Sequence, residues 1–428
     1  MKVVIMAGGR GTRIAELFPD IPKPLIPVDG MPILEREIRS LASQGFKDLI
    51  LTIGYLADKI IACFGDGSQL GVKIDYFVEE TPLGNAGALF QLRDKIGEDP
   101  FLLLNADAAF DVDFNRMLEF HKKHGGLVTL FTHPNSHPYD SGLIIADNDG
   151  NVEKWLSKED ERPQWYNNRV NAGLHVIDPK VLDISLKNLD IDQETGFPNG
   201  KVDLDRQILK PLCGTGKMFC YDSPEYVKDM GTPDRFHQVE ADYKNGVVQA
   251  KNLRNKQKAI FLDRDGTINK YVGFLRNIDD FELIDGVSDA IKRINQSGYL
   301  AIVVTNQPVI ARGEVSWQEL DEIHKKMETL LGKDGAYIDG IYICPHHPDK
   351  GFEGERPEYK FDCDCRKPKP GLLLQAAKDF NIDLSQSYMN GDSEQDVKAG
   401  DAAGVKASVL LPRNEEKALL QVIFSLLC

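Results

Sequence analysis

The amino-acid sequence predicts an α/β protein with two domains. Short apolar runs alternate with helix-length segments along most of the chain, as they do in parallel sheets that helices cover on both faces. Glycines and aspartates follow these runs in both halves, at the strand ends where such folds bind ligands. A polar, basic stretch at 245–257 separates the halves, so we expect domains at 1–244 and 258–428 joined by a linker.

The expected strands are short runs rich in Val, Ile, Leu and Phe, a pattern typical of strands buried on both faces. In the first half they lie at 2–8, 48–54, 73–80 and 101–107. In the second half they lie at 258–266, 299–307, 339–344, 387–392 and 406–412. The two halves carry different motifs, which indicates a fusion of unlike domains rather than a duplication.

Composition narrows the class of function. The chain has 428 residues, of which 42% are hydrophobic and 27% charged, as in a soluble globular protein. The start of the chain reads as a strand rather than a signal peptide, and seven cysteines without an export signal favour a reducing cytoplasm. A net charge of −15 argues against a nucleic-acid partner and leaves phosphorylated small molecules as substrates. We expect no membrane association, and the sequence leaves homo-oligomerisation open.

The stretch MAGGRGTR, Met6 to Arg13, directly follows the first expected strand. It is neither a Walker A loop nor a GxGxxG dinucleotide fingerprint. A glycine turn before a helix lets backbone N–H groups approach phosphate oxygens, and Arg13 is placed to supply charge. Further on, prolines on both sides of Lys23 restrict the backbone that carries this lysine. Taken alone, however, such a glycine turn is more often only a tight turn.

The glycine turn and the PKP motif are followed, in order, by EETPLGNAGAL, LLLNADAAFDVDF, VEKW, VNAGLHVI and DMGTPDRF. With these motifs, roughly the first 240 residues resemble the sugar-1-phosphate nucleotidyltransferases. The stretch FDVDF and its surroundings look most like the branch that guanylylates D-glycero-D-manno-heptose 1-phosphate. The resemblance implies a Rossmann-like domain with a mixed sheet. It also implies transfer of a nucleotidyl group from a nucleoside triphosphate, GTP in this branch, with release of pyrophosphate.

The resemblance also implies roles for individual residues. Arg13 and Lys23 would hold the triphosphate and act catalytically by neutralising charge. The residues implied in nucleotide binding are Gly8, Gly9, Gly11, Thr12, Arg13, Lys23, Leu83, Gly84 and Gly87. Those implied in binding the sugar phosphate are Gly142, Glu153, Lys154 and Asn171. Asp107 and Asp229 would carry Mg²⁺.

Some of these residues also have simpler structural explanations, and two positions differ from the usual pattern of the family. Asp229 could cap the helix that follows it, and Asn171 could end a strand. Asp107 follows the apolar run FLLLN and has no structural reason to be there without a cation. Ala106 stands where the family usually has glycine, and Trp155 stands where it often has proline. Both departures concern the sugar pocket rather than the reaction class.

In the second half, AIFLDRDGTIN places Asp263 and Asp265 just after an expected buried strand. Two carboxylates spaced in this way repel each other unless a divalent cation lies between them. One can attack phosphorus to form an aspartyl phosphate while the other protonates the leaving oxygen. The same spacing also occurs in calcium-binding loops and plain turns, so it is weak evidence alone.

Three further motifs follow in order: VVTNQ, CRKPKPG and MNGDSEQD. With them, residues from about 258 to 411 resemble the haloacid-dehalogenase-like (HAD-like) phosphatases, which implies a Rossmannoid domain. Asp263 would be the nucleophile and Asp265 the acid and base. Mg²⁺ would bind Asp263, Asp392 and the backbone carbonyl of Asp265, with Asp396 in a supporting place. The residues implied in holding the phosphorylated substrate are Thr305, Asn306, Arg366 and Lys367.

Three cysteines and a histidine cluster after the motif VVTNQ, and the last of them, Cys365, begins the motif CRKPKPG. Cys344 and His346 form a Cys-x-His pair, and Cys363 and Cys365 form a Cys-x-Cys pair. This set suits tetrahedral Zn²⁺ in a closed, structural site. Arg366 directly follows the last cysteine, so the metal would brace a loop that positions cations over the substrate. His347 is the expected bystander, although it could replace His346 as ligand.

This zinc-loop arrangement resembles two phosphatases, one acting on D-glycero-D-manno-heptose 1,7-bisphosphate and one on histidinol phosphate. Pro308 and Val309 replace the usual Ser-Gly pair, which stiffens that loop. The heptose 7-phosphatase would make the heptose 1-phosphate that the first half would consume. We therefore expect a bifunctional enzyme that makes GDP-heptose for a surface polysaccharide.

Three other interpretations stay open. The first half could serve mannose or glucose 1-phosphate beside a histidinol-phosphate-like or other sugar phosphatase. One half could be a regulatory module without catalytic activity. The zinc cluster could bind nucleic acid, although the acidic residues around it disfavour this.

Overall fold

The computed structural model describes residues 1–9, 13–14, 16–106 and 108–427, which form two compact units. The first unit comprises Met1–Thr132, Ile144–Leu156 and Asn171–Gln249. The second comprises His133–Leu143, Ser157–Val170 and Ala250–Cys428. Among the described residues, no helix is both long and apolar enough to cross a membrane.

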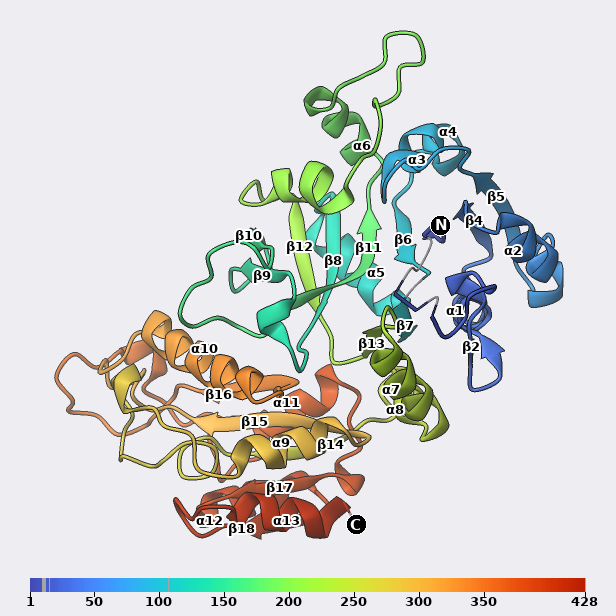
Figure 1. Ribbon diagram of the computed structural model, residues 1–428. Helices are drawn as coiled ribbons and strands as arrows, with labels where there is room; N and C mark the ends of the chain where they lie inside the picture. Colours follow the sequence, from blue (N-terminus) through green and yellow to red (C-terminus); the bar gives the residue numbers. More distant parts are fainter. Residues whose placement is uncertain (10–12, 15, 107, 428) are drawn as a thin grey trace. The chain divides into compact units, whose positions relative to one another are not determined.

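A large mixed sheet forms the centre of the first unit (Figure 1). Its strand order is β10-β9-β11-β6-β1-β4-β5, with β8 beside β11 and β12 beside β8. The strands β6, β1, β4 and β5 are parallel neighbours, whereas β11 runs antiparallel to β6. The strands are β1 (Lys2–Met6), β4 (Asp48–Ile53), β5 (Lys73–Val78), β6 (Phe101–Asn105), β8 (Val128–His133), β9 (Leu143–Ala146), β10 (Val152–Leu156), β11 (Val170–Ile177) and β12 (Met218–Asp222). This confirms the predicted mixed sheet and the four strands expected in the first half.

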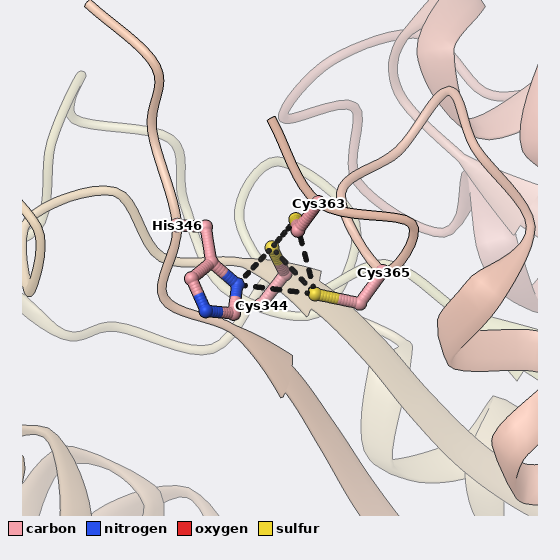
Figure 2. Close-up of side chains that lie close together, drawn as sticks. All are labelled: Cys344, His346, Cys363 and Cys365. Carbon is pink, nitrogen blue, oxygen red and sulfur yellow. Dashed lines mark hydrogen bonds between the residues drawn. The ribbon is translucent and has the colours of Figure 1, made fainter. Parts of the chain in front are cut away.

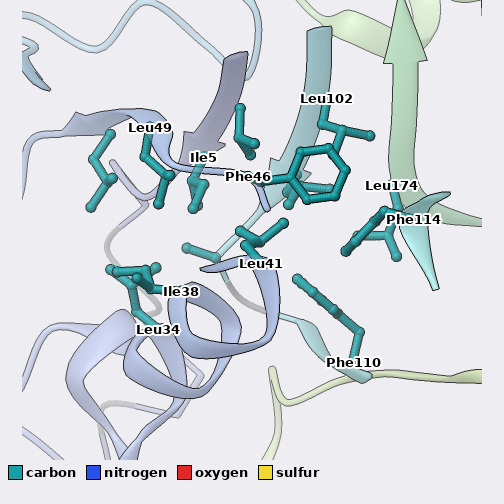
Figure 3. Close-up of a cluster of buried hydrophobic side chains, with 14 of the residues drawn as sticks. Ile5, Leu34, Ile38, Leu41, Phe46, Leu49, Leu102, Phe110, Phe114 and Leu174 are labelled. Carbon is teal, nitrogen blue, oxygen red and sulfur yellow. The ribbon is translucent and has the colours of Figure 1, made fainter. Parts of the chain in front are cut away.

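Helices cover both faces of this sheet. On one face, α1 (Ile33–Ser43), α2 (Ala57–Phe64) and α5 (Phe114–His124) pack on alternate residues of β1, β4 and β6 (Figure 3). The other face meets α3 (Gly87–Gln91), α4 (Arg93–Ile96) and α6 (Lys180–Ser185). Because both faces are buried, the strands read as continuous apolar runs.

Smaller elements complete the first unit. A hairpin joins β2 (Pro27–Val28) to β3 (Met31–Pro32), and a second ribbon pairs β7 (Ala108–Asp111) with β13 (Tyr226–Asp229). The helices α7 (Pro233–Lys244) and α8 (Val247–Ala250) follow the second ribbon.

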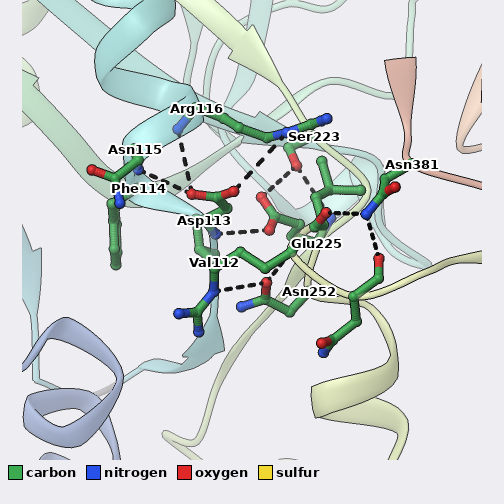
Figure 4. A network of polar contacts seen from close by, with 12 residues as sticks. Val112, Asp113, Phe114, Asn115, Arg116, Ser223, Glu225, Asn252 and Asn381 are labelled. Atoms are coloured by element: carbon green, nitrogen blue, oxygen red, sulfur yellow. Dashed lines mark hydrogen bonds and ion pairs between the residues drawn. The ribbon is translucent and has the colours of Figure 1, made fainter. Parts of the chain in front are cut away.

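The start of α5 illustrates how a distant segment completes a helix. Asp113 caps α5, because its Oδ1 accepts hydrogen bonds from the backbone N–H groups of Asn115 and Arg116 (Figure 4). The backbone N–H of Asp113 in turn donates to Oε1 of Glu225 over 2.8 Å. Glu225 also accepts from the hydroxyl of Ser223 over 2.9 Å, so buried polar groups are paired here.

The second unit contains a fully parallel sheet with the order β16-β15-β14-β17-β18 (Figure 1). These strands are β14 (Lys258–Leu262), β15 (Tyr299–Asn306), β16 (Gly340–Cys344), β17 (Tyr388–Gly391) and β18 (Ala407–Leu410). All five were expected from the sequence. One face packs against α9 (Val287–Asn295), α10 (Trp317–Lys333) and α13 (Ala418–Leu427), and the other against α11 (Gly371–Asp379) and α12 (Glu394–Ala403).

Two segments from the middle of the sequence also belong to the second unit. The hydroxyl of Thr329 on α10 accepts from the backbone N–H of Tyr166 over 2.9 Å and donates to its carbonyl over 3.0 Å. The amide of Asn167 donates to Oε2 of Glu328 over 2.8 Å. The predicted domain limits at 244 and 258 stay a prediction.

The register of the parallel sheet sets the position of the second site. Leu262 pairs with Val303 on one side and with Asn390 on the other. The residues that follow these strand ends therefore meet at one edge of the sheet.

Candidate active sites

A cavity of about 1080 Å³ opens in the first unit. Met6 at the end of β1 pairs with Asn105 at the end of β6, and both line the cavity. The structure brings five of the predicted nucleotide-binding residues to this cavity: Gly8, Gly9, Arg13, Lys23 and Gly84. Gly11, Thr12 and Asp107 lie outside the described residues.

Lys23 opens a short 3-10 helix, Lys23–Leu25, and is only 9% exposed. The prolines on either side hold this turn, with Pro22 at φ −64°. A nearly buried ammonium group in a cavity with Arg13 is suited to the negative charge of a triphosphate.

The loop predicted to line the base is fastened to a distant segment. Gly84 has φ +84°, and a Cβ atom there would lie 2.3 Å from the carbonyl oxygen of Val202. Val202 donates its backbone N–H to the carbonyl of Leu83 over 2.9 Å. At Gly87, a Cβ atom would lie 2.8 Å from that of Leu83. Leu83 and Gly87 thus shape the loop, and Gly84 is its predicted residue in the cavity lining.

Asp229 lies at the end of β13, close to the cavity residue Gly231, whose N–H it accepts. Its carboxylate also pairs with Arg235 on α7. The alternative that Asp229 caps α7 is wrong, because the cap is Thr232, whose hydroxyl accepts from the N–H of Arg235.

Four residues predicted to bind the sugar phosphate do not line the described cavity. Glu153 and Lys154 are exposed on β10, and Gly142 belongs to the second unit. Asn171 on β11 accepts hydrogen bonds from the N–H of Gly173 over 3.3 Å and from the imidazole of His175 over 3.2 Å. Asn171 therefore stabilises the local structure of β11, and its role in binding the sugar phosphate stays a prediction.

Glu79 begins the motif EETPLGNAGAL, but no role for it was predicted from the sequence. Glu79 lines the cavity, and its Oε2 accepts from the N–H of Leu83 over 3.4 Å. Burial raises the pKa of this carboxyl above its usual range. Lys201 also lines the cavity, from a segment without any recognised motif.

A second cavity, of about 240 Å³, lies at the strand ends of the second unit. The structure brings all the predicted phosphatase residues to its lining: Asp263, Asp265, Thr305, Asn306, Arg366, Lys367 and Asp392. The parallel register explains why they meet, because most of these residues lie at or just after the carboxyl end of a strand. Arg366 and Lys367 come from the loop beside those ends.

Lys367 is the central cation of this cavity and is only 2% exposed. Its Nζ lies 2.8 Å from Oδ1 of Asp263 and 2.5 Å from Oδ1 of Asp396. Burial raises the pKa of the Asp263 carboxyl to about 7, although the ammonium of Lys367 opposes this rise. Asp396 also accepts from the N–H and hydroxyl of Ser393, so it anchors α12 and Lys367 together.

Asp265 is held by several hydrogen bonds. The buried guanidinium of Arg264 lies 2.9 Å from its Oδ2, and the amides of Asn269 and Gln307 also donate to it. Burial alone would raise the pKa of the Asp265 carboxyl, but Arg264 and these amides lower it overall. In this arrangement Asp265 is ionised near neutral pH.

Backbone and side-chain contacts fix the position of Lys367. The amide of Asn306 donates to the carbonyl of Lys367 over 3.0 Å and accepts from its N–H over 3.1 Å. The hydroxyl of Thr305 accepts from Gln307 over 2.9 Å. Asn306 therefore holds the lysine as well as lining the cavity.

Carboxylate oxygens of Asp263, Asp392 and Asp396 lie within 4.8 Å of one another, a spacing that suits a divalent cation. Asp392 also pairs with Arg413, a cavity residue that the sequence did not single out. Both carboxylate oxygens of Asp396 already accept hydrogen bonds, from Lys367 and Ser393, whereas the contact with Lys367 falls on Oδ1 of Asp263 and that with Arg413 on Oδ2 of Asp392. Asp263 and Asp392 are therefore the better candidates for ligands.

The predicted cysteine and histidine cluster forms a compact candidate metal centre (Figure 2). The Sγ atom of Cys365 lies 3.1 Å from that of Cys344, 3.2 Å from that of Cys363 and 3.3 Å from Nδ1 of His346. A tetrahedral zinc ion with Zn–S bonds of ~2.3 Å would separate sulfurs by ~3.8 Å, somewhat more than these contacts, so the four atoms lie near enough to share one ion. The contact between Cys344 and Cys365 lowers the pKa of the Cys365 thiol and raises that of Cys344, so Cys365 is the first of the two to become a thiolate.

The structure favours His346 over His347 as the nitrogen ligand. His347 accepts from the N–H of Asp349 and stays outside the cluster. Next to the cluster, Arg366 donates to the carbonyl of His346 over 3.2 Å. The cysteine loop is thus joined directly to the cations of the phosphatase cavity.

The fold and both cavities define two enzyme classes in one chain. Residues 2–246 match the nucleotidyl transferase family, and the chain belongs to it. Residues 364–419 match the HAD-hydrolase-like family. The chain therefore combines a nucleotidyltransferase with a HAD-like phosphatase, as the sequence predicted.

Particular relatives define the second half more closely. Over 156 residues the chain is 50% identical to the D-glycero-beta-D-manno-heptose-1,7-bisphosphate 7-phosphatase of Haemophilus ducreyi, covering 36% of this chain and 83% of that protein. Over 153 residues it is 46% identical to the same enzyme of Escherichia coli K12, covering 36% of this chain and 78% of that protein. The chain therefore also belongs to the family of these phosphatases. The crystal structure of HddC from Yersinia pseudotuberculosis, also determined with GMP-PN, is 24% identical with a TM-score of 0.47, covering 56% of this chain and 99% of that one.

Proposed function

We propose that the chain catalyses two consecutive steps in the synthesis of a nucleotide-activated heptose. The second half removes the 7-phosphate of D-glycero-D-manno-heptose 1,7-bisphosphate, and the first half transfers a nucleotidyl group to the resulting heptose 1-phosphate. The observation that carries this proposal is the cavity that unites Asp263, Lys367 and Asp392, in a half of the chain that is 50% identical over 156 residues to a heptose-bisphosphate phosphatase. The acidic chain supports small-molecule rather than nucleic-acid substrates.

In the phosphatase step, a carboxylate oxygen of Asp263 forms a bond to phosphorus while the bond from phosphorus to the sugar oxygen breaks. The leaving oxygen takes a proton from Asp265. Water then attacks phosphorus and gives its proton to Asp265, which releases phosphate and restores Asp263. Since Arg264 holds Asp265 ionised in the free protein, the acid step requires that carboxyl to turn away from the guanidinium and to take up a proton from water before the sugar oxygen leaves.

In the transferase step, an oxygen of the sugar phosphate attacks the α-phosphorus of the nucleoside triphosphate, and pyrophosphate leaves. No covalent intermediate is needed, so orientation and charge neutralisation by Arg13 and Lys23 provide the catalysis. GTP is the proposed donor. A carboxylate such as Glu79, beside the predicted base loop, can accept both N–H groups that guanine presents together.

Metal ions complete the proposal. Asp263 and Asp392 would hold Mg²⁺ in the second half, and Asp229 with Asp107 would hold it in the first. Bound Mg²⁺ supplies positive charge to phosphate oxygens. We assign Zn²⁺ to Cys344, His346, Cys363 and Cys365, where it would brace the loop that carries Arg366.

The test is to incubate the purified protein with the heptose bisphosphate, Mg²⁺ and each nucleoside triphosphate in turn, and to read the products by mass spectrometry. GDP-heptose formed with GTP alone is the expected result. Heptose monophosphate without any nucleotide sugar would refute the proposed transferase substrate. No turnover of the bisphosphate, with turnover of histidinol phosphate, would refute the phosphatase assignment.

The variant Asp263→Asn separates the two activities. We expect phosphate release to fall at least 1000-fold, because the amide is a poor nucleophile, while nucleotidyl transfer to supplied heptose 1-phosphate stays within about twofold. The exposed Asp280→Asn serves as the matched control and should keep both activities. Loss of both activities in folded Asp263→Asn would contradict two independent sites.

A further inference from the structure

Arg413 follows β18 and lines the phosphatase cavity, where no predicted role falls on it. Two neighbours hold its guanidinium. Its Nε donates to Oδ2 of Asp392, and its Cζ lies 4.2 Å from the centre of the Tyr271 ring. Tyr271 is itself fixed by Asn414, whose Oδ1 accepts the backbone N–H of Tyr271 over 2.6 Å. The position of the guanidinium is therefore set from two sides.

The outer part of this guanidinium is available to a ligand. Within the described residues, no group accepts a hydrogen bond from the two Nη nitrogens of Arg413. Its side chain is 47% exposed, whereas that of Asp392 is only 4% exposed. A planar guanidinium with free N–H groups binds a phosphate through two parallel hydrogen bonds.

Three cations line the cavity: Arg366, which donates to the carbonyl of His346, and Lys367 and Arg413, which lie at different depths. Lys367 is 2% exposed and already contacts Asp263, so it serves the phosphoryl group that is transferred. Arg413 is half-exposed and stacked on Tyr271, which keeps its planar face oriented. Because Arg366 already donates to the cysteine loop, Lys367 and Arg413 are the pair that matches a substrate with two separate anionic groups.

We propose that Arg413 binds the second phosphate of the substrate, the one distant from the scissile bond. This proposal rests on the proposed function and extends it, because it makes Arg413 the residue that selects sugar bisphosphates over sugar monophosphates. It also disfavours alcohol phosphates that carry an ammonium group, such as histidinol phosphate, because that group would face a cation.

The test compares two substrates that differ only in the distal group, heptose 1,7-bisphosphate and heptose 7-phosphate, with the full-length protein. In Arg413→Met, we expect KM for the bisphosphate to rise about 10- to 100-fold, with kcat within about threefold. KM for the monophosphate should change by less than about threefold. Inhibition by the product heptose 1-phosphate should weaken in parallel, since it carries only the distal phosphate.

The controls distinguish a role of Arg413 in substrate binding from a role in holding Asp392 in position. Arg276→Met removes an exposed arginine that pairs with Glu314 outside the cavity lining, and it should leave both KM values unchanged. The Mg²⁺ concentration for half-maximal activity of Arg413→Met on the monophosphate should also stay within about twofold. If both substrates lose activity equally, or if the Mg²⁺ requirement rises, Arg413 only positions Asp392 and the proposal is overturned.

Failure of the proposed function gives a different result. Wild-type protein would then hydrolyse p-nitrophenyl phosphate but not the heptose bisphosphate. If instead the wild type hydrolyses the bisphosphate and the monophosphate with equal kcat/KM, the proposed function stands and the role of Arg413 is refuted.

Discussion

At the scale of single residues, the backbone of Gly84 determines the shape of the predicted base loop. A side chain there meets two obstacles, the positive φ of 84° and the carbonyl oxygen of Val202 at 2.3 Å. Gly97 has the same φ of 84°, but a Cβ atom there would have no neighbour within 4 Å. Substitutions at Gly97 and Gly84 therefore separate the energetic cost of backbone strain from the cost of a steric clash.

We expect Gly97→Ala to lower the free energy of unfolding of the first unit by about 1 kcal/mol through strain alone. Gly84→Ala should cost at least about 2 kcal/mol more and should raise KM for GTP, because the loop must move off Val202. Urea unfolding of both variants, with nucleotidyl transfer measured at 25 °C, checks this. Equal costs in the two variants would contradict the described packing of Gly84 on Val202.

Residue-level prediction succeeded where a functional group directly follows a buried strand. Asp263 and Asp392 follow β14 and β17, so the parallel topology alone brings them together. Arg413 follows the expected strand at 406–412, but that strand is largely exposed and no recognised motif includes Arg413, and Lys201 lies in a segment without a motif. Sequence reasoning therefore missed both.

At the scale of elements, the cysteine loop connects a candidate metal centre to the phosphatase cavity through Arg366. We expect Cys365→Ser to lower the midpoint of thermal unfolding of the second unit by at least about 5 °C, because loss of a metal ligand lowers the stability of this unit. Phosphatase activity should fall at least tenfold, while nucleotidyl transfer should stay unchanged. Cys63→Ser, an exposed cysteine of the first unit, is the matched control.

Metal analysis and scanning calorimetry check this prediction. The wild type should contain about one zinc ion per chain, and Cys365→Ser should contain much less. A full loss of zinc without any change in the thermal midpoint would contradict the bracing role. Iron in place of zinc would support a metal centre at this cluster but would show that the metal is not zinc.

Most of the strands that were predicted contain apolar runs, although β5 was expected with Asp75 within it. The strand β8 was not expected, because it contains Thr129 and Thr132, which are buried at 1% and 0% exposure. Thr132 donates to Asp222 on β12 over 2.7 Å, and Thr129 contacts His121 over 2.9 Å. A polar residue such as Thr132, whose partner lies 90 residues further along the chain, makes a buried strand harder to recognise from the sequence.

At the scale of the whole molecule, each unit contains a buried histidine that folding keeps neutral. Burial lowers the pKa of His175 in the first unit to about 4. Burial, with Arg264 nearby, lowers the pKa of His324 in the second unit to about 3. In the unfolded chain both have a pKa of about 6.5, so between these values the unfolded state binds more protons.

The free energy of unfolding of both units should therefore decrease as the pH is lowered below about 6.5. From pH 7.5 to pH 5, each histidine should reduce the free energy of unfolding of its unit by about 2 kcal/mol. Pulse proteolysis in urea, with the fragments identified by mass spectrometry, follows each unit separately. In His175→Gln, the first unit should lose about this much of its pH dependence while the second unit keeps its own. His324→Gln should give the opposite result, and if neither variant changes the pH dependence, these histidines are not neutral when folded.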